Sequence, residues 1–102
     1  MMKVRNMMTS RGNPVANQFI ISVCPEYGQM RNTVAGEYFQ SYDSIIAFKP
    51  DYPNDLNKVL IDKVYWSYSK TTAKYRNMFL GETTKETQAK IDSGEYKLVD
   101  LN

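Results

Sequence analysis

The sequence predicts an α+β fold, with a small antiparallel sheet of four to five strands and two helices packed on one face of the sheet. Three observations predict it. Residues 18–62 contain short runs rich in β-branched and aromatic residues, separated by turn residues, as is typical of strands. Over residues 67–80 the apolar period changes to that of a helix, and a second capped segment follows. Strands that precede helices in the order β-β-β-β-α-α-β indicate this layered class.

Five segments have the composition of strands. They are residues 18–23, 37–42, 45–49, 58–62 and a closing segment at 95–101. Pro25 stops the first segment and Pro50 stops the third, since proline cannot donate to a strand ladder. The turn residues at 25–36 predict a long hairpin loop, and the Pro, Asn and Asp residues at 50–55 predict a second loop. In the second strand, the alternation places Phe39 on the face opposite Tyr38.

A helix is predicted at residues 67–80 because its apolar positions recur at helical spacing. They are Tyr68, Thr72, Tyr75 and Phe79, which fall at i, i+4, i+7 and i+11. Ser69 is a suitable N-cap, and Gly81 is suited to the position after the helix C-terminus. Lys70, Lys74 and Asn77 are expected on the solvated face, with Arg76 beside them.

A second, shorter helix is predicted with Thr83 or Thr84 as its N-cap, and it is expected to end at Gly94. Glu86 follows Thr83 by three residues, which is the spacing of a capping box. Only Ala89 and Ile91 are apolar in this segment, so the helix is expected to pack lightly on the rest of the fold.

With 102 residues, the chain has the length of one small domain. Residues 1–16 show no periodicity and include Gly12, Asn13 and Pro14, so we expect a mobile tail there and a single domain at 17–102. No apolar run approaches the roughly 20 residues of a membrane helix. The basic N-terminus is not followed by the apolar region of a secretory signal. One unpaired cysteine, Cys24, suits a reducing compartment, so we expect a cytoplasmic protein.

The composition argues against most enzyme mechanisms. The chain has no histidine and one cysteine, which removes Ser–His and Cys–His nucleophile pairs, His-based zinc sites and CxxC clusters. The acidic residues are scattered in turns or on predicted surfaces and do not form a paired metal-binding pattern. The five glycines are isolated and match no phosphate-binding loop. The sequence therefore predicts a protein that is not an enzyme and that uses no cofactor or metal.

Net charge limits the class of partner. Thirteen basic and eleven acidic residues give a net charge of +2. This is neither the negative excess of a DNA mimic nor the strongly basic profile of a dedicated nucleic-acid binder. Basic residues do concentrate at 58–76, and residues 1–18 contain no acid.

Residues 65–77 are the strongest candidate for a binding surface. They combine the only tryptophan, Trp66, with three tyrosines, two lysines and one arginine. Aromatic stacking beside cations is typical of single-stranded nucleic-acid binding, and Trp, Tyr and Arg also dominate protein hot spots. A purely structural alternative remains. Trp66 and the apolar positions of the helix would then be a buried stripe, and its lysines would be a solvated face.

Four segments of the chain resemble one family of proteins. They are NPVANQFII (13–21), GEYFQSYDSIIAF (36–48), YWSYSKTTAKYRNMFLGE (65–82) and SGEYKLVDLN (93–102). The resemblance is to small uncharacterised proteins encoded by bacteriophages and prophages. It implies the cytoplasm of an infected bacterial host, and it supplies no catalytic residues. Small phage proteins without catalytic motifs often act by binding a host protein, as anti-CRISPR and other anti-defence factors do.

The function expected from this is a non-enzymatic phage inhibitor that binds a host defence protein, such as a CRISPR nuclease or surveillance complex, and blocks it sterically. The contact residues expected on the helix side are Tyr65, Trp66, Tyr68, Lys70, Lys74, Tyr75 and Arg76. The loop residues expected as a second contact are Tyr27, Arg31 and Tyr52.

Two other functions remain open. They are a nucleic-acid-binding accessory protein of phage replication or transcription, and a protein that sequesters a small ligand. A monomer and a homodimer are both compatible with the sequence, because an exposed sheet edge could pair with a second copy.

Overall fold

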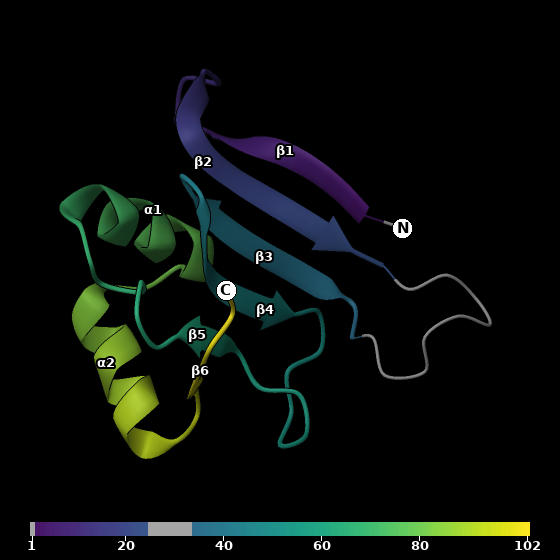
Figure 1. Cartoon of the computed structure of the whole chain (residues 1–102), viewed down its shortest axis with the longest axis vertical. Helices are drawn as coiled ribbons and strands as arrows, with labels where there is room; N and C mark the ends of the chain where they lie inside the picture. Colours follow the sequence, from purple (N-terminus) through teal and green to yellow (C-terminus); the bar gives the residue numbers. More distant parts are fainter. Residues whose placement is uncertain (1, 25–33) are drawn as a thin grey trace.

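A computed structural model describes residues 2–24 and 34–102. In this part of the chain, a six-stranded mixed sheet is joined to two helices, so the predicted α+β class is confirmed (Figure 1). The strands are β1 (Met2–Met8), β2 (Pro14–Val23), β3 (Gly36–Ser41), β4 (Ser44–Pro50), β5 (Leu60–Asp62) and β6 (Lys97–Val99). The helices are α1 (Lys70–Leu80) and α2 (Thr84–Ser93).

The spatial order of the strands follows the chain from β1 to β6. The strands β2 to β5 pair antiparallel with their neighbours, as predicted, and β1, which was not predicted, pairs antiparallel with β2, but β6 pairs parallel with β5. The expectation of a wholly antiparallel sheet is therefore wrong. Two helices separate β5 from β6, and such a long connection lets the chain return to the sheet in the same direction.

The expected N-terminal tail is also wrong, because residues 2–8 form β1. This strand pairs antiparallel with β2, with Arg5 opposite Ile20, and it makes the domain begin inside the predicted tail. Gly12, at φ 82, lies in the turn between the two strands, where its N–H donates to the carbonyl oxygen of Thr9 at 2.9 Å. Backbone pairing stabilises an edge strand with little help from apolar periodicity, so composition gives a weak signal there.

Both helix boundaries follow the predicted local signals. The Ser69 side chain accepts a hydrogen bond from the N–H of Thr72 at 3.1 Å, which caps the start of α1. At the start of α2, Thr83 and Glu86 form the reciprocal hydrogen bonds of a capping box. Both helices end at glycines in the left-handed conformation, as predicted.

The buried face of α1 differs from the predicted stripe. Thr72 and Phe79 are buried as expected, whereas Tyr68 precedes the helix and is exposed, and Arg76 takes an inward position. In α2 the buried residue is Thr87. Of the two apolar residues of this helix, Ile91 is partly buried against the core and Ala89 is exposed. In both helices, hydrogen bonds decide the buried face as much as apolarity does.

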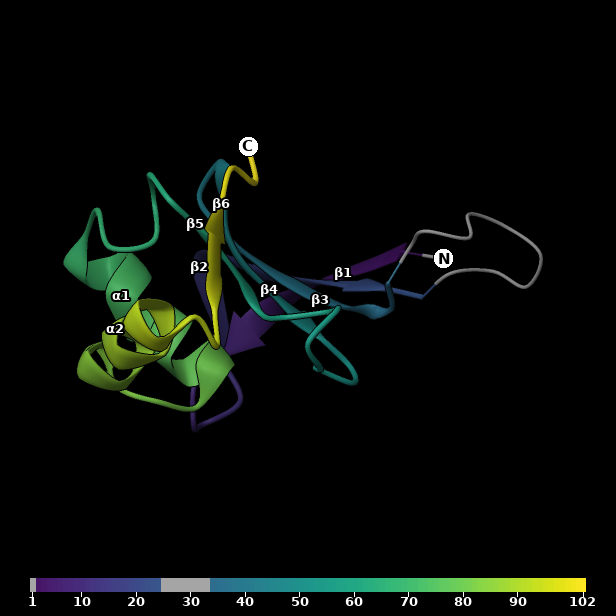
Figure 2. The ribbon, with the colours of Figure 1, turned by 90° about the horizontal axis from the view of Figure 1, so that it is seen from below.

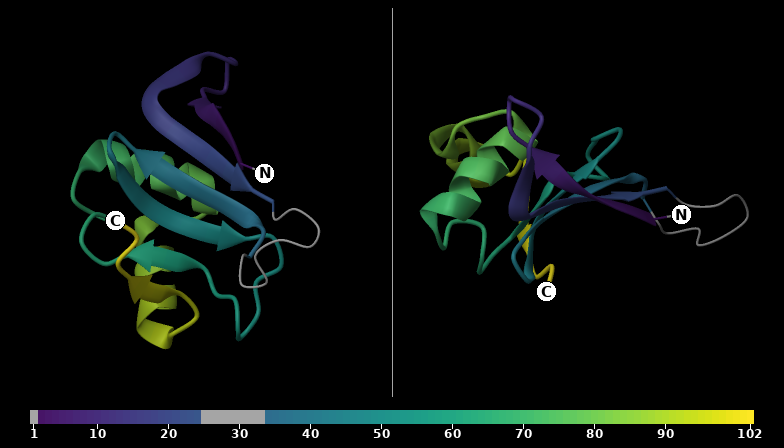
Figure 3. Two further views of the ribbon diagram at one scale, coloured as in Figure 1. Left: turned by 45° about the vertical axis from the view of Figure 1, so that its right-hand side comes forward. Right: turned by 90° about the horizontal axis from the view of Figure 1, so that it is seen from above.

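The helices lie on the same side of the sheet (Figures 2 and 3). Phe39 faces them, with its ring 5.7 Å from the ring of Phe79, whereas Tyr38 points to the opposite face, as the alternation predicts. The core between the layers contains Ile20, Phe39, Ile46, Ala47, Ile61 and Phe79. This arrangement leaves the connection between β5 and α1 at the surface.

Candidate partner-binding surface

Residues 63–69, hereafter the β5–α1 turn, expose two tyrosines side by side. Tyr65 is 36% exposed and Tyr68 is 48% exposed. Their rings meet edge to face, with centroids 5.5 Å apart. Val64, which is also exposed, precedes them. Together they form an aromatic surface at the end of the sheet from which α1 begins.

The backbone of this turn is positioned by Asp62, the last residue of β5. Its carboxylate is fully buried, and one oxygen accepts hydrogen bonds from the N–H groups of Val64 at 3.1 Å and Tyr65 at 2.8 Å. The other oxygen accepts from the backbone of Leu101 and the side chain of Asn102, at 2.8 and 3.0 Å. Sequence analysis expected the scattered acids in turns or at the surface. Asp62 does organise a turn through Val64 and Tyr65, but the surface part of that expectation is wrong because its side chain is buried.

The pKa of Asp62 lies below its ordinary value. Burial acts to raise this pKa, but the hydrogen bonds from Leu101, Tyr65, Asn102 and Val64 together outweigh the effect of burial. The carboxylate is therefore ionised at neutral pH and can accept all four hydrogen bonds. Its charge stabilises the backbone path that carries Tyr65 to the surface.

Arg76 is fully buried, so its expected role as a contact residue is wrong. Its guanidinium donates to the carbonyl oxygen of Trp66, to Asn77 Oδ1 at 3.0 Å and to Thr84 Oγ1 at 2.7 Å. It also lies 4.9 Å from the Trp66 ring centroid, in a cation–π contact. Burial lowers the pKa of Arg76, whereas the charge of Glu82 acts to raise it. Arg76 therefore connects the β5–α1 turn to both helices.

The other aromatic residues of the candidate set are divided between the core and the surface. Trp66 and Tyr75 are partly buried and pack against the core, which fits the structural alternative. Lys70 and Lys74 are exposed, and Lys74 Nζ lies 5.3 Å from the Tyr75 ring centroid. The aromatic surface therefore consists of Val64, Tyr65, Tyr68, Lys70 and Lys74, a subset of the predicted site with one added residue.

Tyr52, the described member of the predicted second contact, is not part of this surface. Tyr52 is 85% exposed on the connection between β4 and β5, which lies apart from the start of α1 (Figures 1 and 2). Tyr27 and Arg31 lie outside the described residues. Among the described members of the predicted set, those brought together all lie on the helix side.

A network around Glu82 connects α2 to Tyr96, the residue before β6. Its side chain accepts hydrogen bonds from Thr87 at 2.5 Å, Tyr96 at 2.6 Å and Lys90 at 2.9 Å. Burial acts to raise the pKa of Glu82, but these three hydrogen bonds lower it below its ordinary value. Burial and the neighbouring Glu82 raise the pKa of Tyr96 to about 12, and the hydrogen bond to Glu82 raises the pKa of Lys90. The carboxylate is shielded by its partners, so its role is structural.

A row of apolar residues, which sequence reasoning missed, lies on the sheet face turned away from the helices. Val4 is exposed, Ile21, Tyr38 and Leu60 are partly exposed, and Phe48 is buried. The strand register aligns one residue from each strand in a row across the sheet. The row contains Val4, Ile21, Tyr38, Phe48, Leu60 and Lys97. Five of the six are apolar or aromatic, and the rings of Tyr38 and Phe48 are 4.5 Å apart. The signal was present as successive apolar residues at 19–21 and 45–48, since a strand that is apolar on both faces loses its alternation.

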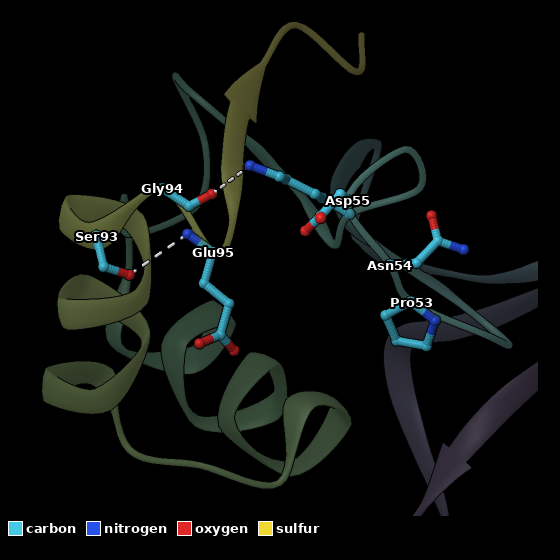
Figure 4. Close-up of a pocket in the computed structure, with 7 residues that line it drawn as sticks. Pro53, Asn54, Asp55, Ser93, Gly94 and Glu95 are labelled. Atoms are coloured by element: carbon cyan, nitrogen blue, oxygen red, sulfur yellow. Dashed lines mark hydrogen bonds between the residues drawn. The ribbon is translucent and has the colours of Figure 1, made fainter.

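The alternative function, sequestering a small ligand, would require a hollow that can hold one. Figure 4 shows a hollow of about 470 Å³ between the β4–β5 connection and the turn from α2 to β6. Lys58 Nζ crosses it and donates to the Gly94 carbonyl oxygen at 2.7 Å. The hollow is lined by Pro53, Asn54, Asp55, Lys58, Ser93, Gly94 and Glu95. None of the residues singled out from the sequence lines it.

Within residues 2–24 and 34–102, no cluster of three or more His, Cys, Asp or Glu side chains is arranged to hold a metal ion. In the same part of the chain, no helix is long and apolar enough to cross a membrane.

Comparison with known proteins gives one match. Residues 2–95 match DUF8033, a family of unknown function. The chain belongs to this family. The DUF8033 match begins in β1 and continues through α2, so it includes the aromatic surface and the strand that was expected to be a tail. Searches of curated proteins and of solved structures find no match.

Proposed function

We propose that this DUF8033 protein is a non-enzymatic inhibitor that binds a partner protein through the aromatic surface and blocks it sterically. The surface offers Tyr65 and Tyr68 as aromatic contacts and Lys70 and Lys74 as nearby cations. The resemblance to phage-encoded proteins makes a bacterial defence protein, such as a CRISPR nuclease or surveillance complex, the proposed partner class.

One observation carries the proposal: two exposed tyrosines stand on a turn that is fixed from beneath by buried charged groups. Asp62 binds the N–H groups of Val64 and Tyr65, and Arg76 binds the carbonyl oxygen of Trp66. Binding normally costs entropy as loops and side chains become ordered. A turn that is already ordered reduces this cost, and tyrosine supplies a large contact area with few rotatable bonds.

The two lysines extend the surface along α1. Neither forms an ion pair with any described residue, so both are available to acidic groups of a partner. Such charges act mainly on specificity and on the rate of association. On a nucleic-acid-dependent enzyme they would occupy positions that phosphates otherwise fill.

The test is a pull-down from bacterial host lysate with the tagged protein, with and without nuclease, followed by mass spectrometry. We expect a stoichiometric protein partner that survives nuclease and is lost with the Tyr65→Ala/Tyr68→Ala double variant. Tyr52→Ala is the matched control, because Tyr52 is an exposed tyrosine on a separate loop. A partner that is retained by the double variant and lost by the control would move the site to the β4–β5 connection.

A second variant separates the role of charge from that of contact area. Lys70→Glu/Lys74→Glu reverses two exposed charges and should slow association while the fold is unchanged. Arg76 is unsuitable for this test, because its side chain is buried and its loss would unfold the turn. If the lysine variant associates with the partner at an unchanged rate, the lysines do not contribute and the contact is limited to the tyrosines.

Nucleic-acid binding is the alternative that the same residues favour, because bases stack on exposed tyrosine rings and lysines contact phosphates. It predicts binding to single-stranded oligonucleotides whose affinity falls steeply with salt. A partner set that disappears after nuclease treatment would support this alternative over the inhibitor.

A further inference from the structure

A different surface, at the first strand, is defined by backbone rather than by aromatic side chains. β1 is one of the two edges of the sheet and pairs only with β2 among the described residues (Figure 3). An edge strand presents a row of backbone N–H and C=O groups to any extended chain that approaches. With seven residues, β1 is longer than β6, the three-residue strand at the other edge.

The side chains of β1 divide by chemistry between the two faces of the sheet. Lys3 and Arg5 lie on the helix side, because Arg5 is opposite Ile20 and Ile20 faces the core. Met2 and Val4 alternate with them on the other face, and they are 67% and 62% exposed. An added strand therefore meets positive charge on one face and apolar surface on the other.

The charged side chains of β1 determine which kind of strand can pair with it. An antiparallel pair of two β1 strands that uses all seven residues places Arg5 directly opposite Arg5 of the second copy. Like charges at directly opposite positions destabilise a strand pair, so the edge disfavours a second copy of this chain. Arg5 donates to Ser22 at 2.9 Å and to Glu37 at 2.9 Å, which positions its guanidinium and leaves further N–H donors. Lys3 forms no ion pair with any described residue.

A groove beside β1 adds apolar contact on the helix side. It has a volume of about 270 Å³ and lies between β1, the sheet and the last turn of α1. Its lining is mixed: the apolar part is Met7, Met8, Ile20, Met78 and Phe79, and the polar part is Arg5, Asn6, Glu37 and Lys49. Methionine side chains adapt to differently shaped apolar partners, which suits a surface that accepts an incoming side chain.

We propose that β1 is a docking edge for an extended segment of a partner protein, which joins the sheet as an additional strand with alternating apolar and acidic side chains. The acidic side chains lie opposite Lys3 and Arg5, and the apolar ones cover Met2 and Val4. Main-chain hydrogen bonds supply affinity, and the alternating side chains supply specificity. This edge is separate from the aromatic surface, so the two proposals stand or fall independently.

The experiment uses a fluorescein-labelled probe peptide with the sequence Ile-Val-Thr-Glu-Val-Glu-Val and the full chain. The control peptide has lysine in place of each glutamate. Binding is measured by fluorescence anisotropy, and NMR hydrogen exchange reports on the amides of residues 2–8. We expect the glutamate peptide to bind, the lysine peptide to bind more weakly, and the β1 amides to exchange more slowly in the complex.

Lys3→Glu tests the charge match, with Lys85→Glu on α2 as a control that makes the same change at another exposed lysine. Lys3→Glu should weaken binding of the glutamate peptide by about fivefold and improve binding of the lysine peptide. Lys85→Glu should change neither. The proposal is overturned if the two peptides bind equally, if both variants behave alike, or if the glutamate peptide fails to bind or binds without protecting the β1 amides.

Discussion

Arg76 and Arg5 show two opposite ways in which this protein accommodates a guanidinium. Arg76 is fully buried and donates to the Trp66 carbonyl oxygen and to two side chains at the junction of the helices. Arg5 is mostly exposed on β1, where it pairs with Glu37 across the sheet. The helix side is therefore stabilised by buried charges with protein partners, whereas the N-terminal hairpin, formed by β1 and β2, combines its backbone ladder with the apolar core residues Met7 and Ile20.

The difference matters for function. A surface supported by buried polar groups has one geometry, because leaving those groups without partners costs free energy. That suits the aromatic surface, whose tyrosines must be presented in a fixed arrangement. An edge strand supported by backbone pairing on one side keeps its other side open for a new strand. The two proposed contacts therefore differ in their support: buried polar groups hold the aromatic surface, whereas backbone pairing with β2 holds the β1 edge.

Replacing each arginine by alanine is the most direct test of this difference in stabilisation. Arg76→Ala should lower the free energy of unfolding by about 3–4 kcal/mol, because it leaves a cavity and removes the donors of three buried or partly buried acceptors. Arg5→Ala should cost at most about 1 kcal/mol, as expected for a solvent-screened pair. Urea denaturation of both variants measures the difference, and equal losses would contradict it.

Asp62→Asn tests the buried anion of the same region. The asparagine NH₂ group would face N–H donors now bound by the carboxylate, so we expect a loss of about 2–3 kcal/mol at neutral pH. Glu37→Gln, which changes an exposed ion pair of the hairpin, should cost at most about 1 kcal/mol. Chemical denaturation at neutral pH compares the two variants.

The pH dependence sharpens this prediction. The folded pKa of Asp62 is lowered, so its contribution is complete above the unfolded value of about 3.9 and is lost as the pH falls through the folded pKa. The stability gap between the wild type and Asp62→Asn should therefore narrow as the pH is lowered below about 4. A gap that stays constant in acid would show that the Asp62 charge is not responsible.

Local sequence signals were enough to predict the helices. The Ser69 cap and the capping box of Thr83 and Glu86 join residues three positions apart, so the chain itself places the partners in range. The antiparallel neighbours β2, β3, β4 and β5 were likewise visible in strand composition. The parallel pairing of β6 was not, because it depends on where the two helices return the chain.

The candidate site was only partly predictable from the sequence, because some hydrogen-bond partners of its buried charged groups are distant along the chain. Tyr65 and Tyr68, both expected contact residues, are exposed, although Tyr68 also belonged to the predicted buried stripe and their role in binding stays a prediction. Arg76 was expected at the surface, as is usual for arginine. Asp62 finds two of its donors at Leu101 and Asn102, about 40 positions away, and no local pattern encodes such a pairing.

Glycine substitutions test how closely the chain is packed at the start of β3 and in the β1–β2 turn. A Cβ atom added at Gly36 would lie 2.5 Å from the carbonyl oxygen of Lys49 and 2.7 Å from the ring of Phe48. Gly36→Ala should therefore cost about 2 kcal/mol through overpacking. Gly12→Ala, in the β1–β2 turn, meets no atom within 4 Å and should cost about 1 kcal/mol, from its positive φ alone. Thermal denaturation ranks the two, and the reverse order would contradict this packing.

Tyrosine substitutions are expected to give the smallest changes in stability. They compare a hydrogen-bonded phenol on the helix side with a phenol on the open sheet face. Tyr96→Phe removes the hydrogen bond to Glu82 and should cost about 1 kcal/mol, whereas Tyr38→Phe on the open sheet face should leave stability nearly unchanged. The folded pKa of Tyr96 is raised to about 12, so its contribution is complete below the unfolded value of about 10 and is lost as the pH rises toward 12. Tyrosinate absorbance during an alkaline titration should show a late-ionising component that is missing in Tyr96→Phe. If Tyr96→Phe leaves that late ionisation in place, the Glu82 network does not shield this phenol, and the helix side loses one of the buried interactions that distinguish it from the hairpin.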